Sequence, residues 1–316
     1  MYQPTFAEAE YATKKHKTRR ERMLERLEAQ VPWKKLEEQL AKKYRKSPLG
    51  PKGYLLSTML RIHVMQLVYD LSDPGMEDEL YEIESMRRFA GLRLSSRIPD
   101  ETTILNFRRF LENHTFGSKL FETIKDHLAQ QGLMLKQGTI VDATIIEAPT
   151  STKNQTGERD PEMHQVKKGN EWHFGMKMHI GVDDAYGLVH SLCTTPANEH
   201  DITQADKLLH GKEKTAWFDA GYTGIEKRPE HQERTIDWQV AMRPGKRAQL
   251  NPLSRAGRLE KLKASVRAKV EHPFRYIKRV FGYGKVRYRG LYKNTQRLYL
   301  LAGLANVFIA EKYLAT

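Results

Sequence analysis

The hydrophobic period of this chain changes at Gly138, and this change limits the possible folds more than any other feature of the sequence. Before it, apolar residues recur at helical spacing over residues 7–46 and 54–135. After it, "GTIVDATIIEA" over 138–148 is rich in β-branched residues, which is typical of a strand. We therefore expect an all-helical N-terminal region followed by an α/β region.

Proline and glycine divide the helical region into segments. Pro32 is expected to end a first helix, and the stretch 47–53, with two prolines and two glycines, is expected to be a linker or turn. The helices expected after it cover residues 54–71, 72–91, 99–114 and 118–133. They fit a plain helical bundle and a bundle that contains a helix-turn-helix equally well. The expected domains are 1–50, 51–135 and 136–316.

The order of elements after Gly138 predicts the sheet. Strands are expected over 138–148, 173–183, 188–196, 214–222 and 238–242, with helices over 197–209, 254–281 and 294–313. The polar segment 150–169 is expected to be an exposed loop. Three antiparallel strands followed by two parallel ones would form a mixed five-stranded sheet of ribonuclease-H type, flanked by helices. In that sheet the first and fourth strands are neighbours.

The charge is large and unevenly distributed. The 316 residues carry a formal charge of +14, with 39% hydrophobic and 29% charged residues, which is a globular composition. Between Arg255 and Arg297 there are fourteen Lys and Arg but only two acids, Glu260 and Glu271, and a second basic cluster covers residues 14–22. A generic basic surface is the alternative, but the clustering favours a surface that binds the phosphates of a nucleic acid.

The cysteine content and the N-terminal sequence indicate the cellular compartment of the protein. Cys193 is the only cysteine, which excludes disulfide scaffolds and cysteine-rich zinc sites. Residues 1–23 lack the apolar stretch of a signal peptide, and no apolar run approaches the roughly 20 residues of a membrane span. The sequence thus predicts a cytoplasmic protein.

Two aspartates stand where a strand is expected to be buried. Asp142 interrupts "TIVDATII" and Asp219 ends the fourth strand in "KTAWFDAGYTG". A buried carboxylate is costly unless it is paired or binds metal, although Asp219 by itself could be an ordinary turn residue. If the first and fourth strands are neighbours, the two carboxylates lie side by side. Such a pair requires a cation, and hard oxygen ligands suit Mg²⁺.

A third carboxylate is expected from a helix packed across this edge. Arg267, Glu271 and Lys278 are spaced by four and seven residues, so they share roughly one helix face. Glu271 could instead be a salt-bridge partner for the surrounding bases. Pro273 is expected to kink the helix or to start a new one, which makes the shared face approximate.

Histidines offer a competing metal site. The group is His164, His173, His179, His190 and His200. His173 and His179 would share a strand face, but no HxxxH or HExxH pattern supports a histidine metal centre. The carboxylate site is therefore the stronger hypothesis.

Several long motifs resemble one known family. They are "VDATIIEAP" around Asp142, "DAGYTG" from Asp219, and "RAKVEHPFRYIKRVFGY" around Glu271, with "RDPEMHQVKKGNEWHFGMKMHIGVD" and "IPDETTILNFRRFLE" elsewhere. In this order they resemble the DDE transposases of bacterial insertion sequences, specifically the insertion-sequence-five group, from about residue 4 to residue 312. The family's C-terminal signature has a Tyr before the Arg, Glu and Lys, and that position is Ala264 here.

The resemblance implies a catalytic triad of Asp142, Asp219 and Glu271 that holds two Mg²⁺ ions, for which Mn²⁺ can substitute. The implied activity is binding of the terminal inverted repeats, hydrolysis at the element ends and joining of the freed 3′-OH to target DNA. A homodimer on double-stranded DNA and a bacterial cytoplasm, close to the nucleoid, are also implied. The candidate DNA-binding residues are Arg267, Lys278, Arg275, Arg279, Lys14, Lys15, Arg19, Arg20 and Tyr222. Tyr222 fits DNA contact and core packing equally well.

Two other functions remain open at this stage. One is a DNA-binding protein without catalysis, such as a repressor of its own element, which would have no need of all three carboxylates. The other is a nuclease that cuts without joining, which the residues alone do not separate from a transposase.

Overall fold

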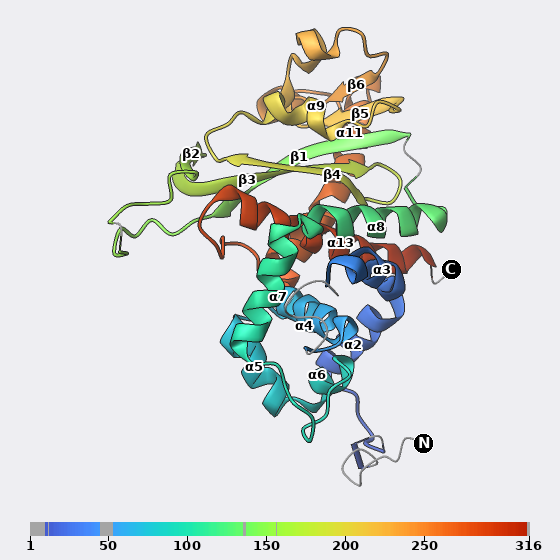
Figure 1. Ribbon diagram of the computed structural model, residues 1–316. Helices are drawn as coiled ribbons and strands as arrows, with labels where there is room; N and C mark the ends of the chain where they lie inside the picture. The colour runs from blue at the N-terminus through green and yellow to red at the C-terminus, as the bar shows by residue number, and fades with distance from the viewer. Residues whose placement is uncertain (1–9, 12, 45–52, 135–136, 156, 315–316) are drawn as a thin grey trace.

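The computed structural model describes residues 10–11, 13–44, 53–134, 137–155 and 157–314. A sheet lies at one end of the molecule and a group of helices at the other, with a long C-terminal helix between them (Figure 1). The N-terminal helices are α2 (Arg19–Gln30), α3 (Trp33–Tyr44), α4 (Leu56–Tyr69), α5 (Asp73–Glu82), α6 (Glu84–Phe89), α7 (Glu101–Asn113) and α8 (Phe116–Gln130). The expected helical region is thus present.

Local chemistry explains several helix ends. Thr18 and Glu21 form a capping box at the start of α2, and Pro32 separates α2 from α3 as expected. The side chain of Asp100 accepts a hydrogen bond from the Thr103 N–H at 2.7 Å, which caps α7. The single helix expected over 72–91 is wrong in one respect, because Ile83 has an extended backbone that divides it into α5 and α6.

The sheet has six strands. They are β1 (Gly138–Glu147), β2 (His164–Lys168), β3 (Glu171–Asp183), β4 (Val189–Pro196), β5 (Thr215–Phe218) and β6 (Asp237–Val240). β3 pairs antiparallel with both β1 and β4, whereas β5 is parallel to β1 and to β6. These five strands follow the order β4-β3-β1-β5-β6, which is the expected arrangement of ribonuclease-H type.

The sixth strand, β2, lies in the segment that was expected to be a loop. It pairs antiparallel with the first residues of β3, from His164 opposite Gly175 to Lys168 opposite Glu171. Four of its five residues are exposed, and only Val166 is half-buried. β2 therefore has no hydrophobic alternation to reveal it, since cross-strand pairing rather than burial stabilises it.

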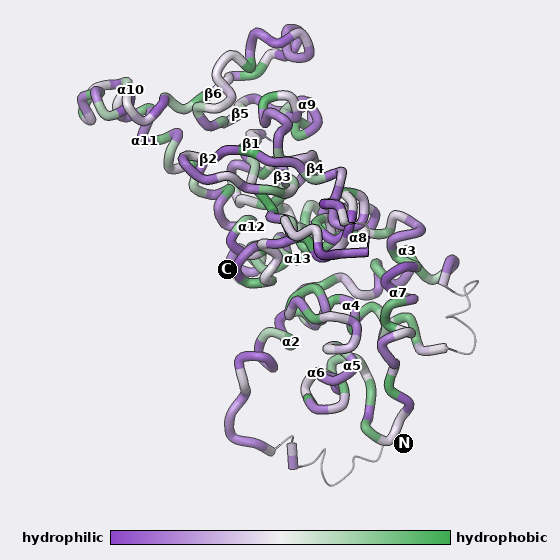
Figure 2. The backbone as a smooth tube through the Cα atoms, turned by 90° about the vertical axis from the view of Figure 1, so that its left-hand side faces the viewer, coloured by the Kyte–Doolittle hydropathy of each residue, from purple (hydrophilic) through white to green (hydrophobic). Residues whose placement is uncertain are grey.

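The two faces of the sheet pack against different elements. Ile140 and Trp217 contact the main core, which runs through the N-terminal helices and α13 (Leu291–Leu314). Val141 and Phe218 face a smaller core around α9 (Ala205–Leu208). The helix expected over 197–209 is short, with a 3-10 turn, η1 (Asp201–Gln204), before α9. In Figure 2, α4 is largely hydrophobic, whereas the segment before α2 is hydrophilic.

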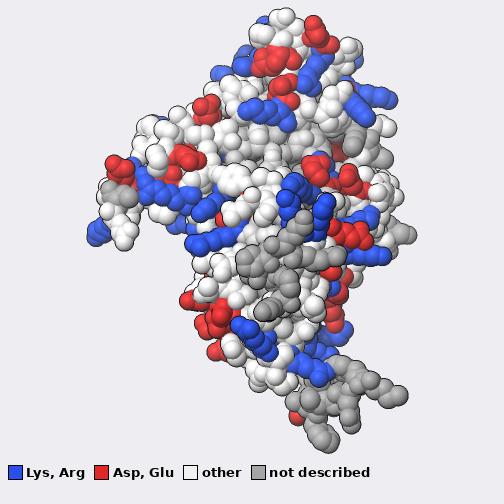
Figure 3. Space-filling view, viewed as in Figure 1, with Lys and Arg blue, Asp and Glu red and all other residues white. Residues whose placement is uncertain are grey.

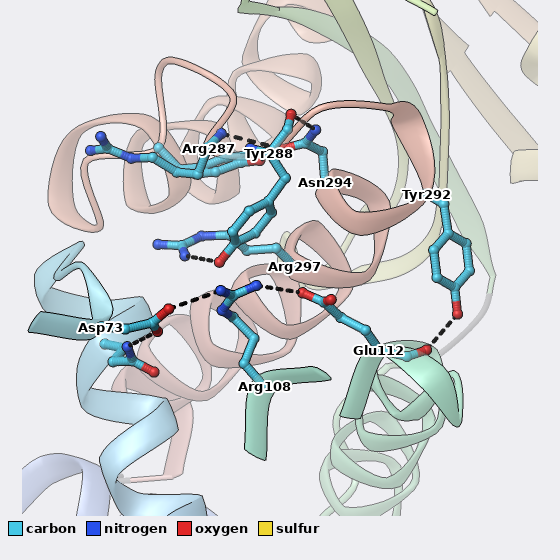
Figure 4. A network of polar contacts seen from close by, with 10 residues as sticks. Asp73, Arg108, Glu112, Arg287, Tyr288, Tyr292, Asn294 and Arg297 are labelled. Carbon is cyan, nitrogen blue, oxygen red and sulfur yellow. Dashed lines mark hydrogen bonds and ion pairs between the residues drawn. The ribbon is translucent and has the colours of Figure 1, made fainter. Parts of the chain in front are cut away.

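A buried polar network joins the helical region to the segment that precedes α13 (Figure 4). Arg108 on α7 donates hydrogen bonds to Asp73 at 2.9 Å and to Glu112 at 3.0 Å. Arg297 on α13 donates to Tyr288 at 3.2 Å and to Asp70 at 2.9 Å. The C-terminal helix therefore shares both an apolar core and ion pairs with the N-terminal helices.

The division into three domains remains a prediction. Both boundaries adjoin or lie within the segments 45–52 and 135–136, outside the described residues. Among the described residues, α13 packs against α2, α4 and α8 as well as β4. No helix in the described ranges is long and apolar enough to cross a membrane.

The chain between β6 and α13 is helical but changes type. α10 (Pro244–Ala248) and α11 (Arg255–Arg267) are followed by a 3-10 turn, η5 (Ala268–Val270), then α12 (Glu271–Arg275) and a π-helical turn, η6 (Tyr276–Val280). Pro273 lies in the first turn of α12, where a missing N–H costs little. The proline is thus accommodated by a new α-helical start directly after the 3-10 turn.

Candidate active site

The parallel pairing of β1 with β5 sets the positions of the two aspartates. Gly138 lies opposite Thr215, and Ile140 lies opposite Trp217. Two residues further along each strand are Asp142 and Asp219, so this register places them side by side. Because side chains alternate along a strand, both face the same side of the sheet as Ile140 and Trp217. The expected juxtaposition of these strands is therefore present.

Asp219 also performs the ordinary work of a turn residue. Its Oδ1 accepts a hydrogen bond from the Gly221 N–H at 2.8 Å and caps the 3-10 turn η2 (Ala220–Tyr222). The turn therefore fixes the position of Oδ1 directly after β5. The turn reading and the site reading of Asp219 are thus compatible.

Asp142 is largely buried, with 18% of its side chain exposed, and is surrounded by charge. Its Oδ1 accepts a hydrogen bond from the Ala143 N–H at 2.8 Å, and its Oδ2 lies 3.5 Å from Nη2 of Arg267. The pKa of Asp142 is raised to about 6, mainly by burial and also by the negative charges of Asp219 and Glu271, whereas the Ala143 N–H and Arg267 oppose the shift. All three predicted triad members therefore interact electrostatically.

The helical segment that carries Glu271 runs along β1. Arg267 contacts Asp142, while Lys278 donates hydrogen bonds to Thr144 Oγ1 at 3.2 Å and to the Ile145 carbonyl at 3.0 Å. Both basic residues thus approach the same strand, as the spacing predicted, despite the changes of helix type. Glu271 itself is exposed at the start of α12.

Asp142, Asp219 and Glu271 carry the hard oxygen donors that a divalent metal prefers, but they are not gathered into one coordination shell. Within the described ranges, no three or more His, Cys, Asp or Glu side chains are arranged to hold a metal ion. The donor set still fits Mg²⁺, because hard carboxylate oxygens lie near one another and repel. The raised pKa of Asp142, caused by burial and by its acidic neighbours, reflects a repulsion that a divalent cation would relieve.

The histidines make separate contacts. His179 is buried and its Nε2 lies 2.8 Å from Thr195 Oγ1, whereas His173 Nδ1 lies 3.2 Å from Glu147 Oε1. The described part of the chain therefore gives the histidine metal hypothesis no support.

The other candidate DNA-binding residues fall into two groups. Arg275 and Arg279 are exposed on the helical segment beyond Glu271, and Lys15 and Arg19 are exposed before and at the start of α2. Lys14 pairs with Glu21, and Arg20 pairs with Glu79 at 2.8 Å. Acidic neighbours thus partly neutralise the N-terminal cluster.

Tyr222 lies in the core rather than at the surface. It is 1% exposed, and its ring packs on Phe218 with the centroids 5.2 Å apart. Of the two readings of Tyr222, core packing is the one that this structure contains. A contact with DNA stays a prediction that requires the side chain to move.

Sequence reasoning missed part of the basic surface beside Lys278. Lys168 at the end of β2 and Lys285 lie with Lys278 and Arg279 around a pocket of about 340 Å³. In Figure 3, Lys and Arg side chains gather around β2 and below it. The sequence signal was weak, because Lys168 belongs to a segment that reads as loop.

The protein is thus of the α/β class, with a sheet of ribonuclease-H type and two aspartates side by side where β1 and β5 stop pairing. Two family models match the chain: "Transposase DDE domain" over residues 134–307 and "Transposase domain" over residues 12–110. The first covers more than half of the chain, so the protein belongs to the DDE transposase family.

One similar solved structure is described as the crystal structure of the Mos1 strand transfer complex. The alignment has 13% sequence identity and covers 91% of this chain and 100% of that chain, with a TM-score of 0.19. At that score the two chains do not superpose as whole structures.

Proposed function

We propose that this protein is a DNA transposase of the insertion-sequence-five group. It would bind the terminal inverted repeats of its element, hydrolyse phosphodiester bonds at the element ends and join the freed 3′-OH to target DNA. The observation that supports this most directly is the register of β1 and β5, which sets Asp142 beside Asp219. Membership of the DDE transposase family supports the same activity.

The residues that would hold metal are Asp142, Asp219 and Glu271. When bound there, two Mg²⁺ ions, for which Mn²⁺ can substitute, would supply Lewis-acid stabilisation of the attacking and leaving oxygens. The carboxylates would also exclude a DNA phosphate from the site until their charge is compensated. The repulsion that raises the pKa of Asp142, beyond the effect of its burial, is in keeping with this requirement.

Arg267 would position the reacting phosphate. Its Nη2 lies 3.5 Å from Asp142, and its Nε is buried without a hydrogen-bond partner among the described residues. A half-buried guanidinium with an unused donor favours an anionic ligand, because a phosphate can accept from two nitrogens at once. We infer that Arg267 turns from Asp142 toward the DNA phosphate when substrate binds.

The reaction would take two displacements at phosphorus. In the first, water attacks the phosphorus at the element end, the bond to the 3′ oxygen breaks, and that oxygen gains a proton. In the second, the new 3′-OH attacks a target phosphorus, loses its proton and displaces another 3′ oxygen. No covalent bond between protein and DNA is needed.

The basic residues outside the site would hold the DNA. Lys15, Arg19, Arg275 and Arg279 are exposed, so their charges are available to backbone phosphates. We expect the helical region over 51–135 to bind the inverted repeats. Two ends must be joined in one event, so the complex on DNA is expected to be a homodimer.

The decisive experiment uses a labelled duplex that carries the element's own end, a target plasmid and Mg²⁺. Asp219→Asn is the test variant, because an amide oxygen can still accept the Gly221 N–H while the charge is lost. Asp126→Asn, an exposed change on α8, is the matched control. We expect cleavage and joined product with the native protein and the control but none with Asp219→Asn.

The other outcomes identify the alternatives. DNA binding without cleavage by any of the proteins, in Mg²⁺ or Mn²⁺, would leave a DNA-binding repressor. Cleavage without joined product would leave a nuclease.

A further inference from the structure

One edge of β1 has no strand neighbour over half of its length. β5 pairs with β1 only as far as Ile140. The next main-chain contact on that edge is at Glu147, whose N–H donates to Gly284 at 3.0 Å and whose carbonyl accepts from Val286 at 2.8 Å. Residues 141–146 therefore border a gap in the sheet, and Asp142 lies at its β5 end.

Side chains occupy two of the main-chain groups along this gap. The Ala143 N–H donates to the carboxylate of Asp142, and the Ile145 carbonyl accepts from Lys278. The free edge is thus protected against pairing with another strand. It also holds an acidic group at one end and a basic group further along.

The far end of the gap opens into a pocket of about 340 Å³, which we call the edge pocket. Its lining includes Thr144, Glu147, Lys168, Lys278, Arg279 and Lys285. Four of these six are basic, and they come from three separate parts of the chain: β2, η6 and the segment after it. The pocket is therefore a product of the tertiary fold.

The positive charge in the edge pocket is not neutralised. Within the described ranges, no carboxylate lies within ion-pair distance of Lys168, Lys278, Arg279 or Lys285. The one acid in the lining, Glu147, is engaged by His173 at 3.2 Å. The pKa of Lys278 is lowered, mainly by burial and also by the charges of Lys168 and Arg279, whereas Glu147 and Glu271 oppose the shift.

We propose that the edge pocket binds a backbone phosphate of the same DNA strand whose reacting phosphodiester lies at Asp142 and Asp219. This inference rests on the proposed function. A phosphate would supply the anion that the four bases lack, and Arg279 and Lys278 would reach it from the helix while Lys168 and Lys285 close around it. The strand would then run along the free edge of β1.

The spacing agrees with a position close to the reacting bond. Thr144 and Glu147, which line the pocket, lie two and five residues along β1 from Asp142, or about 7–17 Å at about 3.3 Å per residue. Successive phosphates of a B-form strand are separated by more than the axial rise of about 3.4 Å, because the strand winds around the axis, so the bound phosphate lies within a few nucleotides of the reacting one. We therefore expect the edge pocket to set which phosphodiester bond reaches the carboxylates.

The test is a double variant, Lys168→Gln with Lys285→Gln, since both side chains are exposed and the change should not affect folding. The control is Lys167→Gln with Lys212→Gln. Lys167 is the neighbour of Lys168 but points to the other face of β2, and Lys212 precedes β5 at the end of that strand away from Asp219. The control removes the same charge from the same protein.

We expect the double variant to bind the element end about tenfold more weakly at moderate salt, whereas the control stays within about twofold of the native protein. Each lost phosphate contact should reduce the slope of log K against log salt by about 0.9. Duplexes with one neutral methylphosphonate at successive positions would then locate the contact. At one position within a few nucleotides of the cut, the native protein should lose affinity while the double variant loses none.

The outcomes separate this inference from the proposed function. If the native protein cuts and joins DNA but the double variant and the control bind alike, the edge pocket has no role in DNA binding. The same follows if no methylphosphonate position distinguishes the native protein from the double variant. If the native protein neither binds nor cuts its element end, the proposed function fails and this inference fails with it.

Discussion

Arg267 and Asp142 face each other across the junction of α11 and β1, with Nη2 3.5 Å from Oδ2. The charge of Arg267, together with the Ala143 N–H, opposes the effect of burial and of two acidic neighbours on the pKa of Asp142. This contact links the basic helical segment to the part of β1 that carries Asp142.

Replacing Arg267 should reduce catalysis more than binding. In Arg267→Gln, we expect single-turnover cleavage of the element end to slow by about 100-fold, which is typical of losing one group that stabilises transition-state charge. Arg267→Lys should recover only part of the rate, since an ammonium makes no bidentate contact. Cleavage by Arg267→Gln at the native rate would show that Arg267 serves only to pair with Asp142.

Metal binding should stabilise the folded protein through the carboxylates. At 10 mM Mg²⁺ and a dissociation constant near 1 mM, the free energy of unfolding should rise by about 1.4 kcal/mol. Thermal unfolding with and without Mg²⁺ measures this increase. Asp142→Asn should show little of this increase with Mg²⁺. Without metal, Asp142→Asn should be more stable than the native protein, because the substitution removes a buried charge beside two acids. An equal Mg²⁺ effect in both proteins would place the metal elsewhere.

His63 should make the protein less stable in mild acid. The pKa of His63 is lowered to about 3, mainly by burial and also by the charges of Arg297 and Arg108, whereas Gln66 and Asp73 act in the opposite direction. The unfolded chain takes up this proton near pH 6.5 and the folded protein only near pH 3. Stability therefore falls as pH decreases between these values, by at most about 1.4 kcal/mol per pH unit.

Urea unfolding at pH 7 and pH 5 measures this effect. His63→Gln cannot titrate, so the loss between the two pH values should be about 2 kcal/mol smaller than in the native protein. His16→Gln, an exposed change, should keep the native pH dependence. If His63→Gln loses as much stability between pH 7 and pH 5 as the native protein does, groups other than His63 cause the acid sensitivity.

Arg108 should contribute strongly to stability. It donates to Asp73 and Glu112 in the network of Figure 4, and both carboxylates would lose their cation in Arg108→Ala. Breaking such a mostly buried set typically costs about 3–5 kcal/mol. Lys17→Ala, which removes an exposed pair with Glu25, should cost less than about 1 kcal/mol. Chemical denaturation compares the two, and equal losses would show that the network is not stabilising.

The sequence by itself determined the elements whose signals are local. The helical spacing before Gly138, the break at Pro32 and the β-branched run from Gly138 predicted helices and strands because backbone preferences and hydrophobic period act over a few residues. The order of those elements was also enough to make β1 and β5 neighbours, and hence to bring Asp142 and Asp219 together.

Tertiary structure alone decided what has no local signal. β2 forms because β3 offers it a partner, Tyr222 is buried because Phe218 and the small core enclose it, and Lys168 meets Lys285 only where β1 loses its neighbour. Each depends on contacts between residues distant in the chain, whose energies arise only after the sheet has formed. The local pattern around such residues is the same whether those contacts exist or not.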